Sequence, residues 1–170
     1  ERPFVVVLGG AKVSDKLAVI ESLLTRADTI VVGGAMAYTF IKALGGDVGD
    51  SLVEDDMLGT AVDIMRRADA SGVTLLLPSD SVCADRLEHG VDTSLCPSDA
   101  IPAGLKGLDI GPTAVSDFGA ALADARTVFW NGPLGVFEIE EFAAGTLAIA
   151  KVIADLPAFT VVGGGDSLAA

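Results

Sequence analysis

The sequence has few of the residues from which metal centres and disulfide-linked folds are built. It contains two cysteines, Cys83 and Cys96, and one histidine, His89. The cysteines are thirteen residues apart and form no Cys-x-x-Cys pair. We therefore expect two reduced thiols, with a disulfide between them as the open alternative. One histidine and no cluster of cysteine and histidine argue against a zinc site.

Positive charge is also scarce. Eleven lysines and arginines stand against 24 acidic residues, and the net charge is -13. This balance argues against nucleic acid or an anionic membrane as a partner, because phosphate backbones attract an excess of lysine and arginine. It leaves room for a small phosphorylated ligand, since physiological salt limits the reach of distant charges to ~8 Å.

Long hydrophobic runs are missing as well. No stretch approaches the ~18 apolar residues that a membrane helix needs. No basic segment followed by an apolar stretch marks a signal peptide. We expect a cytoplasmic protein without a membrane partner.

Apolar residues are abundant and arranged in alternating strand and helix patterns. They make up 51% of the 170 residues, enough for one domain with a buried core. The predicted strands are 4–8, 29–32, 73–77, 127–130 and 159–162, and the predicted helices are 14–24, 35–44, 54–70, 113–123 and 140–153. This order predicts a Rossmann-like α/β fold, a parallel sheet flanked by helices on both faces. Residues 78–111 interrupt it with three prolines and short strand-like pieces, which indicates a small hairpin-like insertion.

Three of the apolar runs end in paired or tripled glycine. Glycine lets the backbone turn sharply and approach a ligand closely. A helix that follows such a turn presents free N–H groups to anions. The turns therefore predict a phosphate or nucleotide site at the strand ends. The glycines concerned are Gly9 and Gly10, Gly33 and Gly34, and Gly163, Gly164 and Gly165.

Lys12 and Lys16 follow the first glycine pair, at a spacing that places both on one face of a helical first turn. One interpretation is a pair of solvated surface lysines. The other is a phosphate site, because cations at a helix N-terminus oppose the helix dipole by ~0.3–1 kcal/mol each and a bound polyanion removes that conflict. We favour the phosphate site. Asp15 between them either orients Lys16 or is a favourable acid in the first turn.

Asp166 follows the third glycine turn, and two roles are open for it. It could cap the helix that follows. It could also bind Mg²⁺, which typically uses one or two carboxylates together with phosphate oxygens.

The segment 130–138 is unusually dense in special residues for a connection. It holds the only tryptophan of the chain and an Asn-Gly-Pro turn at Gly132. Leu134 and Phe137 offer apolar surface, and Glu138 could accept hydrogen bonds from ribose hydroxyls; the alternative is a structured turn with an acid in the following first turn. No G-x-x-x-x-G-K-[ST] occurs, and no G-x-G-x-x-G follows the first strand, which argues against a P-loop and weakens a dinucleotide site.

Five segments resemble, in the same order, the C-terminal, nucleotide-binding half of phosphoglycerate kinases. They are LGGAKVSDK at 8–16, VGGAMAYTF at 32–40, GLDIGP at 107–112, WNGPLGVFE at 130–138 and GGGDS at 163–167. The resemblance implies reversible phosphoryl transfer between 1,3-bisphosphoglycerate and ADP, a step of glycolysis that yields 3-phosphoglycerate and ATP with Mg²⁺ as cofactor.

The resemblance also implies roles for individual residues. Lys12 and Lys16 would face the phosphates, with Lys16 next to the transferring group, and Asp166 would contact the metal. The remaining nucleotide-binding positions would be Gly10, Ala11, Gly33, Gly34 and Gly107 along the adenosine, Leu134 against the adenine, Glu138 on the ribose, Gly164, Gly165 and Ser167 on the phosphate chain, and Gly132 and Phe137 in the same site.

The sequence departs from the family pattern in small and large ways. Ala35 stands where some members have a third glycine, and Ser167 where some have threonine. From the resemblance we also expect two parts of the family to be missing from these residues, the N-terminal domain that binds the acid substrate and a glycine-rich segment beyond Ala170. We therefore expect residues 1–170 to be one nucleotide-binding domain, incomplete at its C-terminal end and inactive alone, from a monomeric parent that binds 3-phosphoglycerate through the missing domain.

Two other classes of function stay open. A non-catalytic nucleotide- or dinucleotide-binding module would also use strand–glycine–helix turns. A purely structural or interaction domain would bind no nucleotide at all.

Overall fold

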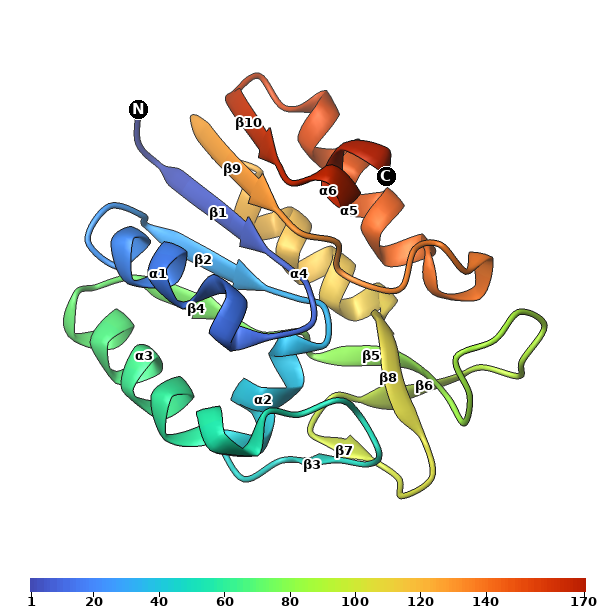
Figure 1. The fold of residues 1–170 in the computed structure, drawn as a ribbon. Helices are drawn as coiled ribbons and strands as arrows, with labels where there is room; N and C mark the ends of the chain where they lie inside the picture. Colours follow the sequence, from blue (N-terminus) through green and yellow to red (C-terminus); the bar gives the residue numbers. More distant parts are fainter.

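The computed structural model describes residues 1–170, and the five predicted strands form one parallel sheet (Figure 1). The strands are β1 (Phe4–Leu8), β2 (Thr29–Val32), β4 (Thr74–Leu76), β9 (Thr127–Asn131) and β10 (Phe159–Gly163). Their spatial order is β10-β9-β1-β2-β4. This is the order of doubly wound folds, in which ligands bind at the carboxyl ends of the strands where the winding reverses. Here that point lies between β1 and β9.

Helices cover both faces of this sheet, as the alternating pattern predicts (Figure 1). The helices α1 (Val13–Leu23), α2 (Met36–Ala43) and α3 (Leu58–Ala70) pack on one face, and α4 (Pro112–Leu122) and α5 (Ala144–Asp155) pack on the other. A short helix, α6 (Gly165–Ala169), follows β10. The predicted fold class is confirmed. None of these helices has the length and apolar character needed to cross a membrane.

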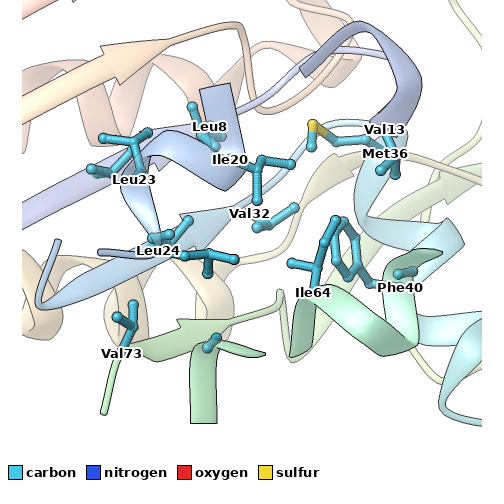
Figure 2. Close-up of a cluster of buried hydrophobic side chains, with 14 of the residues drawn as sticks. Leu8, Val13, Ile20, Leu23, Leu24, Val32, Met36, Phe40, Ile64 and Val73 are labelled. Atoms are coloured by element: carbon cyan, nitrogen blue, oxygen red, sulfur yellow. The ribbon is translucent and has the colours of Figure 1, made fainter. Parts of the chain in front are cut away.

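The central strands are apolar on both sides because each side is buried under helices. Along β1, Val6 and Leu8 face the layer of α1 to α3, whereas Val5 and Val7 face α4 and α5. Figure 2 shows the first layer, where Phe40 of α2 and Ile64 of α3 join Leu8. The sheet thus separates two hydrophobic layers, and its carboxyl edge is the part that stays open to a ligand.

The predicted hairpin insertion is present and is larger than expected. The strands β5 (Asp80–Ala84) and β6 (Ser94–Pro97) form the antiparallel hairpin, and β8 (Lys106–Ile110) extends it to three strands. Two short strands, β3 (Asp47–Val48) and β7 (Ala100–Ile101), pair beside it. The strand β8 was not predicted, because Lys-Gly-Leu-Asp-Ile has no apolar run. The two thiols of the insertion are free and buried.

Two predicted helices begin later than their sequence pattern indicates. The stretches 54–70 and 140–153 each open with a separate 3-10 turn, η1 (Asp55–Met57) and η2 (Glu140–Phe142). The start of α5 is fixed by a residue distant in sequence, because the Gly145 N–H donates to Asp109 of β8 at 2.8 Å. Before α3, Glu54 lies outside the helix and accepts a hydrogen bond from the Ser14 N–H at 3.2 Å.

The glycine turns interlock at the point where the winding reverses. The Gly9 N–H donates to the carbonyl of Asn131 at 2.9 Å, and the Gly10 N–H donates to the carbonyl of Pro133 at 3.0 Å. A Cβ on Gly9 would lie 2.0 Å from the Pro133 carbonyl oxygen, and one on Gly132 would lie 2.2 Å from that of Gly9. These two positions therefore admit no side chain without moving the backbone of the neighbouring turn.

Replacing Phe40 by alanine should strongly destabilise the fold. Phe40 is fully buried (0% exposed) between α2 and the sheet, and truncation of such a side chain costs about 3–5 kcal/mol. Denaturant unfolding measures this loss. The control is Leu147→Ala on α5, where the side chain is 49% exposed and the change should be under about 1 kcal/mol. Equal losses in the two variants would contradict the assignment of the core.

Replacing Gly9 by alanine should separate the first glycine turn from the loop after β9. The new Cβ would overlap a backbone oxygen, so the free energy of unfolding should fall by about 3 kcal/mol or more. The matched control is Gly59→Ala in α3, where an added Cβ meets no atom within 4 Å and no loss is expected. A Gly9→Ala protein that unfolds at the same denaturant concentration as the unaltered protein would refute the interlock.

Candidate functional site

Two adjoining cavities open at the carboxyl edge of the parallel sheet, and the larger one lies between the strand ends and the insertion. Their volumes are about 520 Å³ and about 260 Å³. Both are lined by Gly10, Ala11, Pro133 and Asp166, so the four residues form a shared wall. The cavities are two parts of one cleft at the position where a doubly wound fold binds its ligand.

The larger cavity has a mainly apolar wall. Apolar side chains come from the shared wall, from the insertion through Leu87 and Leu108, and from the loop after β9 through Val136. Six polar side chains are also part of the wall, among them Glu138, Lys106 and Asp109. A cavity of this size and character suits a small molecule with a flat apolar part and a few hydrogen-bonding groups.

Gly107 keeps this wall flat because the ring of Tyr38 lies directly behind it. A Cβ on Gly107 would lie 2.0 Å from the Tyr38 hydroxyl oxygen. That hydroxyl donates to Ser81 Oγ at 2.8 Å, and Ser81 Oγ lies 2.7 Å from Ser98 Oγ. Burial raises the pKa of Tyr38, so the phenol stays protonated as a donor.

The smaller cavity is polar and carries the two lysines. Lys12 stands at the N-cap position of α1, and Lys16 lies in the first turn of this helix. The ammonium group of Lys16 donates a hydrogen bond to Asn131 Oδ1. Both lysine side chains line this cavity beside the glycine turns after β9 and β10. Two cations and nearby backbone N–H groups suit an anionic ligand, in a chain whose overall charge is strongly negative.

The third glycine turn is tied to the loop after β9 through a buried hydroxyl. Ser167 is 4% exposed, and its Oγ accepts a hydrogen bond from the Gly132 N–H at 2.7 Å. The hydroxyl proton is left to donate to a ligand in the polar cavity. Asp166 beside it is exposed and lines both cavities.

The carboxylates of the cleft suit a cation that is coordinated by the protein and by a bound ligand together. No group of three or more His, Cys, Asp or Glu side chains comes together in a metal-binding arrangement. Asp166 and Asp15 are the two carboxylates on the wall of the polar cavity. Mg²⁺ is commonly held by one or two carboxylates with substrate phosphates and water. The donor set therefore fits Mg²⁺ bound together with phosphate, rather than a cation held by protein alone.

All but two of the predicted site residues line one of the cavities. The exceptions are Gly33 and Phe137. Gly33 lies behind the wall, where a Cβ would be 2.4 Å from Leu134 Cδ2, and Phe137 lies in a half-buried turn. Leu134 reaches the cavity only at its edge, because its side chain is 1% exposed and belongs to the core layer of Trp130. The predicted packing of adenine on Leu134 is thus available over a small surface.

Sequence reasoning missed several residues of the cleft, chiefly Tyr38, Lys106, Asp109 and Asn131. Asp109 is 2% exposed, and burial raises its pKa to about 7 although backbone hydrogen bonds from Gly145 and Ile110 act to lower it. Apolar alternation in Leu-Asp-Ile would turn Asp109 toward solvent, so no local signal marked it as buried. The signal for Asn131 was its place at the end of a buried strand.

Comparison with known proteins identifies the family. The family profile described as Phosphoglycerate kinase matches residues 1–170. The chain is 61% identical over 171 residues to "Phosphoglycerate kinase" of Thermus thermophilus, covering 100% of this chain and 44% of that protein. It is 51% identical to "Phosphoglycerate kinase, cytosolic" of Nicotiana tabacum, covering 100% of this chain and 43% of that protein.

Solved structures agree. The chain superposes on phosphoglycerate kinase from Coxiella burnetii with a TM-score of 0.97 and 41% identity, over 99% of this chain and 44% of that one. For the enzyme from Pyrococcus horikoshii the TM-score is 0.83 at 33% identity, over 99% and 43%. The chain spans less than half the length of these relatives. Over its whole length, it belongs to the phosphoglycerate kinase family.

Proposed function

We propose that this chain is the nucleotide-binding part of a phosphoglycerate kinase, corresponding to the C-terminal domain, and that it binds ADP and ATP with Mg²⁺. The observation that carries the proposal is the joined cleft, in which an apolar cavity meets a lysine-bearing polar cavity across the shared wall of Gly10, Ala11, Pro133 and Asp166. A nucleotide has the same division into an apolar base and an anionic chain.

In this proposal the adenosine lies in the larger cavity and the phosphates lie in the smaller one. Glu138, exposed at the rim of the larger cavity, accepts hydrogen bonds from the ribose hydroxyls. Lys12 and Lys16 face the phosphates, and the Ser167 hydroxyl donates to them. Asp166 stands where both cavities meet, and so beside the phosphate chain.

The reaction we infer is phosphoryl transfer from the acyl phosphate of 1,3-bisphosphoglycerate to ADP. The bond between phosphorus and the carboxyl oxygen breaks, and a bond from phosphorus to a terminal ADP oxygen forms; the reverse reaction consumes ATP. Such a transfer depends on positioning and on neutralisation of charge on the phosphoryl oxygens. Lys16 supplies that charge from this chain, and Asp166 would hold Mg²⁺, which supplies further neutralisation when bound.

The acid substrate would bind to the part of the relatives that this chain does not span. We therefore expect the 170 residues to bind nucleotide and to show little turnover alone. Calorimetry with ADP, ATP, adenosine and NAD, with and without Mg²⁺, tests the proposal. Saturation with ADP at a hundred times its dissociation constant should stabilise the fold by ~2.7 kcal/mol. Tighter binding of NAD would favour a dinucleotide module, and no binding would favour a structural domain.

Replacing Lys16 by alanine should weaken ADP binding about ten- to hundredfold, because the ammonium group would no longer bond to a phosphate. Adenosine, which has no phosphate, should bind almost as before, and calorimetry with both ligands measures the contrast. The control is Lys151→Ala on α5, an exposed lysine outside both cavities. Equal losses for ADP and adenosine would remove Lys16 from the phosphate site.

Replacing Asp166 by asparagine should affect ADP binding differently with and without Mg²⁺. Without the metal, the variant should bind ADP at least as tightly, because a negative charge near the phosphates is removed. With Mg²⁺, it should bind about tenfold or more weakly than the unaltered protein. Asp155→Asn, an exposed aspartate at the end of α5, is the matched control. A Mg²⁺-dependent gain in affinity that survives in Asp166→Asn would contradict the metal-binding role.

A further inference from the structure

Asp109 is a buried carboxylate at which β8, the loop after β9 and the start of α5 meet. It lies on β8, in the wall of the larger cavity, and is 2% exposed. One oxygen, Oδ1, accepts from the Ile110 N–H at 2.9 Å, and the other, Oδ2, accepts from the Gly145 N–H at 2.8 Å, in the first turn of α5. Both oxygens therefore act as acceptors of backbone hydrogen bonds.

The loop after β9 packs against the same carboxylate. A Cβ on Gly135 would lie 2.2 Å from Asp109 Oδ1, and one on Gly145 would lie 2.5 Å from it. The Val136 N–H donates to the Leu108 carbonyl at 2.9 Å, so the loop that leads to Glu138 runs along β8 beside this contact. The loop, β8 and α5 thus meet at one side chain.

We propose that Asp109 is a positioning residue, which holds residues 132–139 and the start of α5 against β8 and thereby sets the shape of the larger cavity for the nucleoside. This role rests on the proposed function. It is distinct from ligand contact, because the side chain is only 2% exposed and each carboxylate oxygen accepts a hydrogen bond from the backbone.

No cation balances this carboxylate. The other titratable side chains on the wall of the larger cavity are those of Tyr38, Asp50, Lys106, Glu138 and Asp166. None of them is hydrogen-bonded or ion-paired to Asp109, and on β5 the residue opposite it is Val82. The charge state of Asp109 is therefore controlled by burial and by the two backbone donors.

Protonation has opposite effects on the fold and on the cleft. Burial raises the pKa of Asp109 to about 7 in the folded protein, whereas the unfolded chain releases this proton near the ordinary aspartate value of ~3.9. Between these values the folded state holds the extra proton, so this group's contribution to stability is lost as pH rises through about 7. The ionised form, however, is the one in which both oxygens accept. The nucleoside cavity should therefore be better ordered at higher pH.

Adenosine is the probe that tests the proposal, because it has no phosphate that titrates near neutral pH. The unaltered protein should bind adenosine about fivefold more tightly near pH 8 than near pH 6, the ratio expected from a charge-assisted bond that becomes neutral. Asp109→Asn presents an NH₂ group to a backbone N–H, so it should bind about fivefold more weakly at pH 8 and show no dependence on pH.

The matched control is Asp80→Asn. Asp80 also accepts two backbone hydrogen bonds at a helix start, from the N–H groups of Thr113 and Ala114 at 3.1 and 2.7 Å, and it lines neither cavity. This variant should keep the pH dependence of the unaltered protein. If Asp109→Asn does not fold, the Gly145 amide proton shift of the unaltered protein should titrate together with the adenosine affinity.

The outcomes separate the two proposals. Absence of adenosine and ADP binding to the unaltered protein would overturn the proposed function and this role with it. Nucleotide binding combined with an adenosine affinity that is flat, or tighter near pH 6, would overturn the role of Asp109 alone. The role of Asp109 alone would also be overturned if Asp109→Asn bound adenosine as the unaltered protein does, or if the Gly145 amide shift did not follow the adenosine affinity.

Discussion

The cleft depends on the contact of main chain with main chain where β1 and β9 end. Gly9 and Gly132 approach so closely that neither has space for a Cβ, and Gly10 and Gly34 donate their N–H groups to the loop after β9. Because the backbones touch, the N–H groups and the starts of α1 and α2 converge on one small region. The two hydrophobic layers pack on either face of the strands that carry these turns.

Charge is distributed so that the cleft differs from the rest of the molecule. The chain carries a net charge of -13, yet both lysines that follow β1 line the polar cavity. Screening by salt confines the influence of remote carboxylates, so the local potential is set by the groups of the cavity wall, the two lysines together with Asp15 and Asp166. A strongly acidic surface disfavours a polyanionic partner such as nucleic acid, and the lysines of the cleft favour a small anion at that one place.

The sequence pattern predicted those features of the fold that depend only on neighbouring residues. The five strands and the glycine turns were visible because buried parallel strands are continuous apolar runs and the turns need Gly9 and Gly132. What escaped depends on distant partners. The acceptor of Lys16 is an asparagine more than a hundred residues away, and β8 is a strand whose inward positions are Gly107 and Asp109. The helix expected from 140 starts at Ala144 because a carboxylate on β8 binds Gly145. Gly33 and Phe137 belong to the predicted motifs but line neither cavity, so their part in the site stays a prediction.

The shared wall between the cavities has a consequence for how a two-part ligand is held. Once a base occupies the apolar cavity, a phosphate attached to it through a sugar is held at the polar cavity at a high effective concentration. The second contact is then intramolecular, and its entropic cost is reduced by the short tether. Separate base and phosphate compounds gain no such advantage, and a longer tether reduces it. The four wall residues thus fix the distance between the two cavities, and a ligand that fills both must have a linker of matching length.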